Sequence, residues 1–280
     1  MKNKSKKILS LLLLIGTFNM ALGQISVRIL DKDIDLEITK LDQLNSTYEE
    51  ANLSITPSGK YIFYQSERPG GPDANIYEAS NGKLRYDANI WYSKKTATGW
   101  AKPKTINAPA GSSSNEDEPM VSPDGKTVAF QSWRRGWELS GGPYYVSQLY
   151  GETWGSPKGM GSGINDFFVD MSEIDGNGTD GAAISPDGKK FVFAWGKDYY
   201  GKLDLYMSTK NSNGTWSYPK KMKISTPGDE RSVFFGSDSK TLFFSSDGYK
   251  GFGGLDIYKT IIDDKGSSKE VLNLGEKFNT

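Results

Sequence analysis

Catalysis in this chain would have to rest on carboxylates, tyrosines, lysines or arginines, because its 280 residues include no histidine and no cysteine. The missing histidine excludes His-assisted nucleophilic triads and histidine-ligated zinc or iron. The enzyme classes that remain are glycosidases with a carboxylate pair and sialidase-like sites with clustered arginines. Residue types alone assign no catalytic residue, and we expect no cofactor.

One stretch has the alternating oxygen groups of a calcium loop. It begins at Asp175 and continues through Asn177 and Thr179 to Asp180. An EF-hand needs a bidentate glutamate at position twelve, where this chain has Pro186. We therefore interpret the stretch as a turn and expect no metal site.

Aromatic and cationic side chains offer a different chemistry, the binding of a ligand. Trp133 and Trp137 bracket Arg134 and Arg135, and Glu138 follows. Indole rings stack on sugars or on arginine, and arginine pairs with carboxylates. The alternative is that these rings and arginines stack on one another and recognise nothing. The candidate ligand-binding residues of the whole chain are Arg68, Trp133, Arg134, Arg135, Trp137, Glu138, Trp195, Tyr199 and Tyr249.

A repeated turn must position these side chains. The run Ser185-Pro186-Asp187-Gly188 predicts a tight turn, because proline presets φ and glycine tolerates a positive φ. An aromatic strand follows it. The turn recurs around Pro57 and Pro123, and around Ser237 without proline or glycine. We expect this last turn to be the least regular.

More than the turn recurs. A third strand follows each hairpin, at 89–93, 144–147, 204–208 and 256–259, and an outer strand comes next. Trp100, Trp154 and Trp216 recur in the outer hairpins, where we expect them to serve packing. Four strands per repeat at this period are typical of a propeller blade. The sequence therefore predicts an all-β fold, a β-propeller of four recognisable four-stranded blades.

The first repeat contains an internal duplication. Residues 73–77 (Asp-Ala-Asn-Ile-Tyr) are repeated at 87–91 as Asp-Ala-Asn-Ile-Trp. We interpret the duplication as an inserted turn or hairpin rather than as a functional motif.

The repeated pattern, Ser-Pro-Asp-Gly-Lys, aromatic strand, glycine-rich loop, Asp-Ile-Tyr and Gly-x-Trp-x-x-Pro, resembles the WD40-like repeats of TolB-type propellers. The resemblance covers about residues 44–280. It implies a protein exported by a Gram-negative bacterium, of a kind sometimes joined to an OmpA-like domain. It implies no particular activity, because propellers host many unrelated functions.

Blade topology brings two sets of loops to one face. The loop entering strand one and the loop between strands two and three lie on the same side of a four-stranded antiparallel blade. The entry loops carry the acids Glu49, Glu50, Glu116, Asp117, Glu118, Asp180, Asp229 and Glu230. Because these acids recur with the repeat, we expect them to accept backbone N–H bonds between blades. The candidate binding residues lie in the second set of loops.

The N-terminus has the features of a secretory signal peptide. Four lysines precede an apolar stretch at 8–15, and small residues before Gln24 fit cleavage after Gly23. This predicts periplasmic, outer-membrane-associated or secreted localisation, without an integral membrane segment after cleavage. Cleavage would leave 30 basic and 34 acidic side chains, a net charge of −4. Without a basic stripe, nucleic acid is not an expected partner.

The expected domain organisation follows from these boundaries. Residues 1–23 form the signal peptide, 24–47 an N-terminal strand segment, and 48–280 the repeats. The repeats span approximately 48–114, 115–177, 178–228 and 229–280. Residues 25–30 and 35–38 alternate like strands. Because open sheet edges promote association, we expect this segment to add one or two strands beside the last or first blade, as a partial fifth blade.

Two functions remain open. The leading hypothesis is an exported non-catalytic scaffold that binds an envelope protein or a glycan. The alternative is a carbohydrate-active propeller, either a glycan-binding protein or a glycosidase that depends on carboxylates. A non-repeated carboxylate pair at the channel would favour the enzyme.

Overall fold

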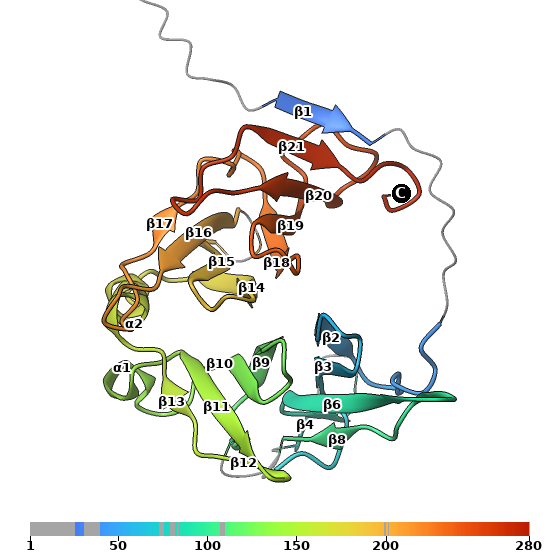
Figure 1. The fold of residues 1–280 in the computed structure, drawn as a ribbon. Helices are drawn as coiled ribbons and strands as arrows, with labels where there is room; N and C mark the ends of the chain where they lie inside the picture. Colours follow the sequence, from blue (N-terminus) through green and yellow to red (C-terminus); the bar gives the residue numbers. More distant parts are fainter. Residues whose placement is uncertain are drawn as a thin grey trace, which may run out of the picture.

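The computed structural model describes residues 26–30, 40–72, 76–78, 82, 84–106, 110–198, 200 and 202–279. The fold is mostly β, with four small antiparallel sheets arranged as a four-bladed β-propeller (Figure 1). The inner strands of the four blades are β2 (Glu50–Ile55), β9 (Glu116–Val121), β14 (Gly178–Ile184) and β18 (Glu230–Phe235). The second strands are β3 (Tyr61–Ser66), β10 (Thr127–Ser132), β15 (Lys190–Gly196) and β19 (Thr241–Ser246).

The outer parts of the blades vary more. The third strands are β6 (Asn89–Thr96), β11 (Tyr144–Tyr150), β16 (Asp204–Thr209) and β20 (Asp256–Ile261). The outermost strands are β7 (Gly99–Trp100), β8 (Lys104–Thr105), β12 (Thr153–Trp154), β13 (Lys158–Gly159), β17 (Lys220–Lys221) and β21 (Glu270–Asn273). The all-β propeller prediction is confirmed.

The hairpin turns have one geometry in all four blades. Gly125 and Gly188 have φ of 70° and 71°. In the fourth turn Ser239 takes φ of 57°, and Gly236 N–H donates to Thr241 O as its counterparts do. The expectation of a less regular fourth turn is therefore wrong. The Asp238 carboxylate accepts the N–H groups of Lys240 and Thr241. In the second and third turns the Ser122 and Ser185 hydroxyls accept the N–H group that corresponds to that of Thr241.

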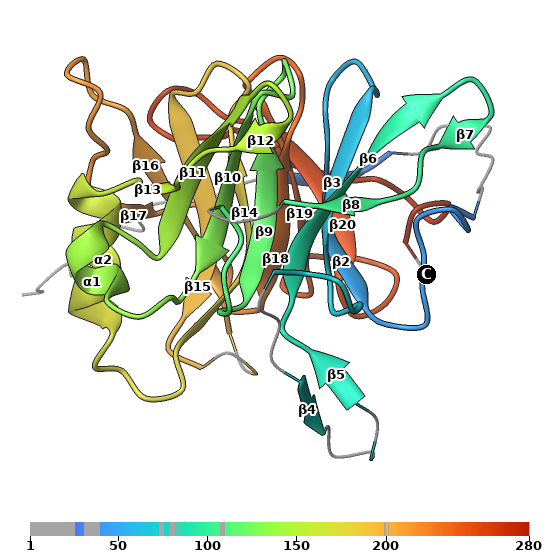
Figure 2. The same cartoon turned by 90° about the horizontal axis from the view of Figure 1, so that it is seen from below.

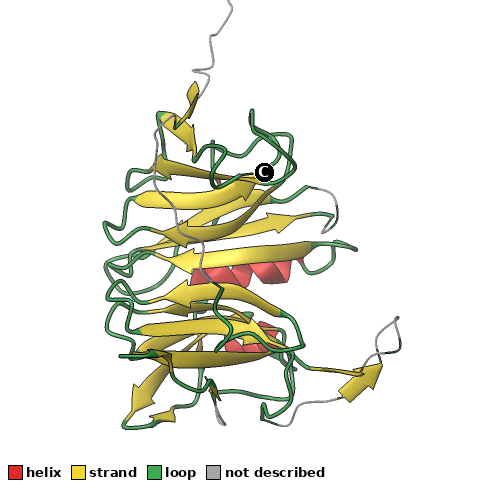
Figure 3. Ribbon diagram, turned by 90° about the vertical axis from the view of Figure 1, so that its right-hand side faces the viewer, coloured by secondary structure: helices red, strands yellow, loops and turns green. Residues whose placement is uncertain are grey.

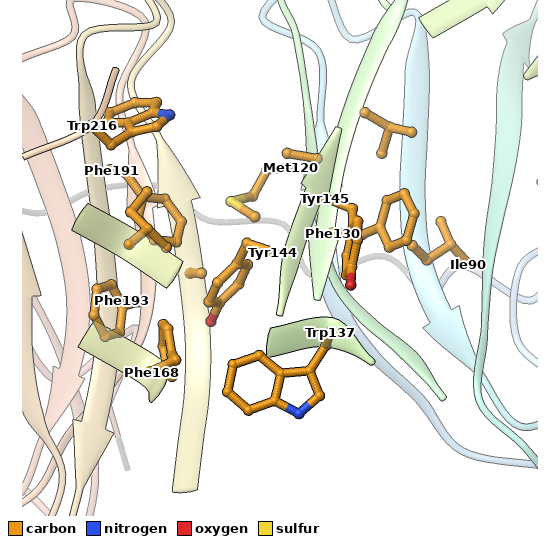
Figure 4. Packing of buried hydrophobic residues seen from close by; sticks show 14 of the residues in the cluster. Ile90, Met120, Phe130, Trp137, Tyr144, Tyr145, Phe168, Phe191, Phe193 and Trp216 are labelled. Carbon is orange, nitrogen blue, oxygen red and sulfur yellow. The ribbon is translucent and has the colours of Figure 1, made fainter. Parts of the chain in front are cut away.

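Buried aromatic side chains join the blades. Tyr144 of β11 lies 4.8 Å from the Phe191 ring of β15, and Phe193 is also within 6.2 Å (Figure 4). Trp154 packs edge-on against Phe63 of the first blade, and it is 1% exposed. The packing role expected for this outer tryptophan is confirmed.

Two helices interrupt the repeat and were not predicted. The short α1 (Trp137–Ser140) lies in the loop after β10, and α2 (Ser162–Met171) connects the second and third blades. Ile164, Phe167 and Phe168 are buried, at the spacing of one helical face. This helix therefore adds its aromatic side chains to the core between the two blades.

The expected inserted hairpin is present in the first blade. Strands β4 (Ile76–Glu78) and β5 (Leu84–Tyr86) pair antiparallel and project away from the ring (Figures 2 and 3). Arg85 anchors the hairpin to the blade through Glu67 at 3.3 Å. The first copy of the duplicated sequence thus reaches β4 of this added hairpin, with residues 73–75 outside the described residues, and the second copy reaches β6 of the blade itself.

The N-terminal strand joins the last blade. Strand β1 (Ser26–Ile29) pairs in parallel with β21, which confirms an added strand beside that blade. Because β1 belongs to the sheet of blade four, the expected partial fifth blade is wrong. Residues 35–38 lie outside the described residues. Inner strands β2 and β9, β9 and β14, and β14 and β18 contact one another, but no contact of similar extent joins β18 to β2 among the described residues.

Candidate functional site

The repeated acids hold the entry loops together. Glu116 is fully buried and accepts the N–H of Ser112 at 3.2 Å. Glu50 and Glu230 accept the N–H of Ser46 and Thr226 in the same way. Burial raises the pKa of Glu116 to about 7. This confirms the expectation that these acids accept backbone N–H groups of the segments that connect the blades.

Three candidate binding residues are engaged inside the blades. Arg68 pairs with Glu50 at 2.7 Å, and Arg134 pairs with Glu116 at 3.3 Å. Each guanidinium also donates to a connecting-loop carbonyl and lies over aromatic rings. Tyr249 occupies the corresponding loop of the fourth blade and donates to Ile224 O. These side chains brace the loops, and a binding role for them stays a prediction.

The second-blade loop is partly exposed. Trp137 is buried, while Trp133 is 43% exposed with its ring 5.0 Å from that of Trp137. Arg135 and Glu138 are exposed. The structure thus brings together Trp133, Arg135 and Glu138 on one loop as accessible groups.

The remaining two candidates are not part of that loop. Trp195 is 4% exposed and packs edge-on against Phe167 at 5.4 Å. Tyr199 lies outside the described residues. Asp175 and Gly176 lie in a turn before β14, where the Asn177 side chain donates to Ile174 O, and Asp180 belongs to β14 itself. No group of three or more acids, histidines or cysteines placed to hold a metal ion occurs within the described ranges.

A central cavity was missed from the sequence. It has a volume of about 520 Å³, and residues from all four inner strands line it. Leu53, Ile55 and Phe234 line the cavity and are 55%, 39% and 39% exposed. Met120 and Ala183 add apolar wall from the other two inner strands. The signal that could have found it is the run of apolar residues along each inner strand.

A bulge shapes the wall of this cavity. One residue at the bulge of each inner strand has a positive φ. These residues are Asn52 (50°), Glu118 (51°), Gly181 (94°) and Ser232 (53°). The register with the second strand shifts at these points. A bulge redirects a side chain and bends its strand. All four bulge residues line the cavity.

Polar contacts link neighbouring bulges. The Asn52 side chain donates to Asp117 at 2.7 Å. Arg231 bridges Asp180 and Asp229 at 2.8 and 2.6 Å. The inner strands are thereby tied together at one end of the cavity, while the apolar side chains form the walls.

Glu118 is held by a longer network. Its carboxylate accepts the Tyr144 hydroxyl and the Gly181 N–H, both at 2.6 Å. Gln131 donates to the Tyr144 oxygen at 3.0 Å and accepts from the Trp133 indole at 2.9 Å. Burial and the nearby Asp117 charge raise the pKa of Glu118 to about 8. The network connects the cavity to the exposed second-blade loop.

Fold and site together define a four-bladed β-propeller with an apolar central cavity. No protein-family model matches the chain, and no curated protein matches it. Its structure is similar to TolB from Acinetobacter baumannii, with 19% identity and a TM-score of 0.47, over 83% of this chain and 45% of that one. This chain therefore spans less than half the length of that TolB.

Two further solved structures share the propeller fold at low identity. A candidate TolB from Agrobacterium tumefaciens is 16% identical with a TM-score of 0.40, over 84% of this chain and 85% of that chain. Prolyl oligopeptidase B from Galerina marginata is 13% identical with a TM-score of 0.36, over 85% and 31%. The likeness is one of fold alone.

Proposed function

We propose that this protein is an exported, non-catalytic scaffold that binds an extended apolar segment of an envelope protein in its central cavity. The observation that carries the proposal is the cavity itself, about 520 Å³ in volume with exposed Leu53, Ile55 and Phe234 in its walls. Large apolar side chains that remain exposed inside a concave site are typical of binding surfaces.

Backbone groups support an extended segment as the ligand. The residues after the inner strands, Thr56, Ser122, Ser185 and Gly236, donate their N–H groups to the second strand. In an antiparallel ladder, the residue before each of them directs its N–H the other way, toward the cavity. In the second blade this residue is Val121, and its N–H donates to Ser54 Oγ of the first blade. Such strand edges pair with extended peptides.

The signal-like residues 1–23 support export, and they lie outside the described residues. No helix in the described part of the chain is long and apolar enough to cross a membrane. On the basis of the signal-like residues, the proposed site of action is the periplasm or the cell surface.

The glycan alternative fits the cavity less well. Glu118 does not recur in the other blades, so a non-repeated acid is present, and Asp117 precedes it. The Asp117 carboxylate, however, is engaged by Asn52 and by the Glu118 N–H at 2.6 Å. Sugar hydroxyls need many polar partners, whereas the inner strands present mainly aliphatic and phenyl groups.

Site-specific photocrosslinking in the native host tests the proposal. Benzoylphenylalanine replaces Leu53 in the cavity, Arg135 on the second-blade loop, or Leu139, which is 96% exposed on α1. We expect a partner to crosslink at position 53 only, and a synthetic peptide of its crosslinked segment to compete. Crosslinking at position 135 without crosslinking at position 53 would show that the partner binds the second-blade loop instead.

The intact mass of the protein purified from the native host tests export. We expect a mature chain that begins at Gln24.

A further inference from the structure

Glu118 occupies an unusual place in the cavity wall. Glu118 stands at the bulge of β9, is 3% exposed, and is the one acidic residue among the described residues that line the cavity. Asn52, Gly181 and Ser232 hold the corresponding position in the other blades. The fold therefore does not require an acid at this position.

The Glu118 carboxylate has no cationic partner among the described residues. Both of its oxygens accept from neutral donors, the Tyr144 hydroxyl and the Gly181 N–H. The other buried acid of this strand, Glu116, has Arg134 beside it. Lys210 also lines the cavity, but its ammonium lies over the Trp216 ring at 5.4 Å.

The charged groups around Glu118 further disfavour its ionised form. Asp117 on β9 and Asp180 on β14 both act on it electrostatically, and Tyr144 on β11 is neutral. Arg231 on β18 pairs with Asp180 and Asp229 rather than with Glu118. A buried carboxylate without a cation is strongly disfavoured unless it is protonated or paired.

We propose that Glu118 recognises a cationic side chain, so that the segment bound in the cavity carries a lysine or arginine between apolar residues. This inference rests on the proposed function, because it names the chemistry of the segment that the cavity takes. Apolar flanking residues would contact Leu53 and Phe234, and the ammonium or guanidinium would pair with the Glu118 carboxylate. An ionised hydrogen-bond partner in a dry site gives both affinity and selectivity.

Proton linkage supplies an independent signature. Burial and Asp117 raise the pKa of Glu118 to about 8, so the empty cavity holds the protonated acid at lower pH. A bound cation favours the ionised form, and binding therefore releases a proton. Affinity for a lysine-bearing segment should rise as the pH rises from about 6 to about 9, because free lysine stays charged up to about pH 10.

The test compares two blocked pentapeptides by calorimetry. One has the sequence valine, leucine, lysine, leucine, valine, and in the other norleucine replaces lysine, which keeps the chain but removes the charge. We expect the lysine peptide to bind roughly tenfold more tightly at pH 9, with a smaller advantage at pH 6. Glu118→Gln should abolish both the preference and its pH dependence. The amide still accepts from Gly181 and contacts Tyr144.

Glu116→Gln is the matched control, because this acid is equally buried but does not line the cavity. It should keep the lysine preference. Equal binding of the two peptides to the wild-type protein, or a preference that survives in Glu118→Gln, would overturn the inference and leave cavity binding intact. Failure of both peptides to bind the wild-type protein would overturn the proposed function together with the inference. If Glu118→Gln does not fold, the wild-type protein still tests the inference, because its preference for the lysine peptide must grow from pH 6 to pH 9.

Discussion

Single residues in this protein separate into those that brace the blades and those that face the cavity. Arg68 and Arg134 have the residue type and the loop position of ligand-binding groups, yet each donates to an entry-loop glutamate and to a loop carbonyl. Sequence reasoning could place these arginines next to acids on one face. It could not tell that the acids were their partners, because pairing depends on distances of a few ångströms.

The bracing role of Arg134 predicts a loss of stability. Arg134→Met keeps contact with Tyr145 but leaves the buried Glu116 without its cation, so the free energy of unfolding should fall by about 3 kcal/mol. Urea unfolding measures the change. Arg135→Met is the matched control, because its side chain is exposed and should change stability by less than about 0.5 kcal/mol. Similar effects from the two variants would argue against the brace.

At the scale of elements, the repeated turns and strands were predictable, and the helix α2 was not. Proline, aspartate and glycine fix each turn locally, and the strand residues alternate between two packed faces. Ile164, Phe167 and Phe168 do show helical spacing, but the segment stands where the other repeats have a connecting loop. Comparison with the other repeats therefore predicted a loop at the position of this helix.

The bulge of β14 leads to a second prediction at this scale. A Cβ at Gly181 would lie 2.7 Å from Ser232 Cα of the next blade, whereas a Cβ at Gly188 meets nothing within 4 Å. Both glycines have positive φ, of 94° and 71°. Gly188→Ala should therefore destabilise by about 1 kcal/mol through backbone strain alone. Gly181→Ala should cost at least about 2 kcal/mol, because the blades must also separate. Thermal melting of the two variants compares these effects.

The same bulge shows why the cavity was missed. Asn52, Glu118, Gly181 and Ser232 share no side-chain chemistry, so no motif marks them. Their common feature is a backbone conformation, and a conformation of this kind is visible only when all four strands are placed around one centre. The acids near them were predictable as structural because they recur.

In the whole molecule, a strand from the N-terminus forms the outer edge of the last blade. Strand β1 covers the edge of β21, and Arg28 pairs with Glu270 at 3.0 Å on the exposed surface. An uncovered edge offers unpaired N–H and C=O groups to another chain. This strand therefore pairs the edge groups of β21 and becomes the outermost strand of blade four.

Removal of residues 24–30 should make the protein associate with increasing concentration, as measured by light scattering. Arg28→Ala keeps the strand and removes only an exposed ion pair, so this control should remain unassociated, with little change in melting temperature. A truncated protein that stays monodisperse and melts like the full chain would show that β1 does not protect the edge.

The bulges have a consequence for how such a protein diversifies. At Asn52, Glu118 and Ser232 the backbone sets the direction of the side chain. The Asn52 and Glu118 side chains also make hydrogen bonds to the neighbouring blade. At Gly181 a side chain would meet Ser232 of the next blade. One propeller thus carries three positions around a common centre at which a side chain is accommodated. A change of ligand would need new residues at those positions and no new architecture.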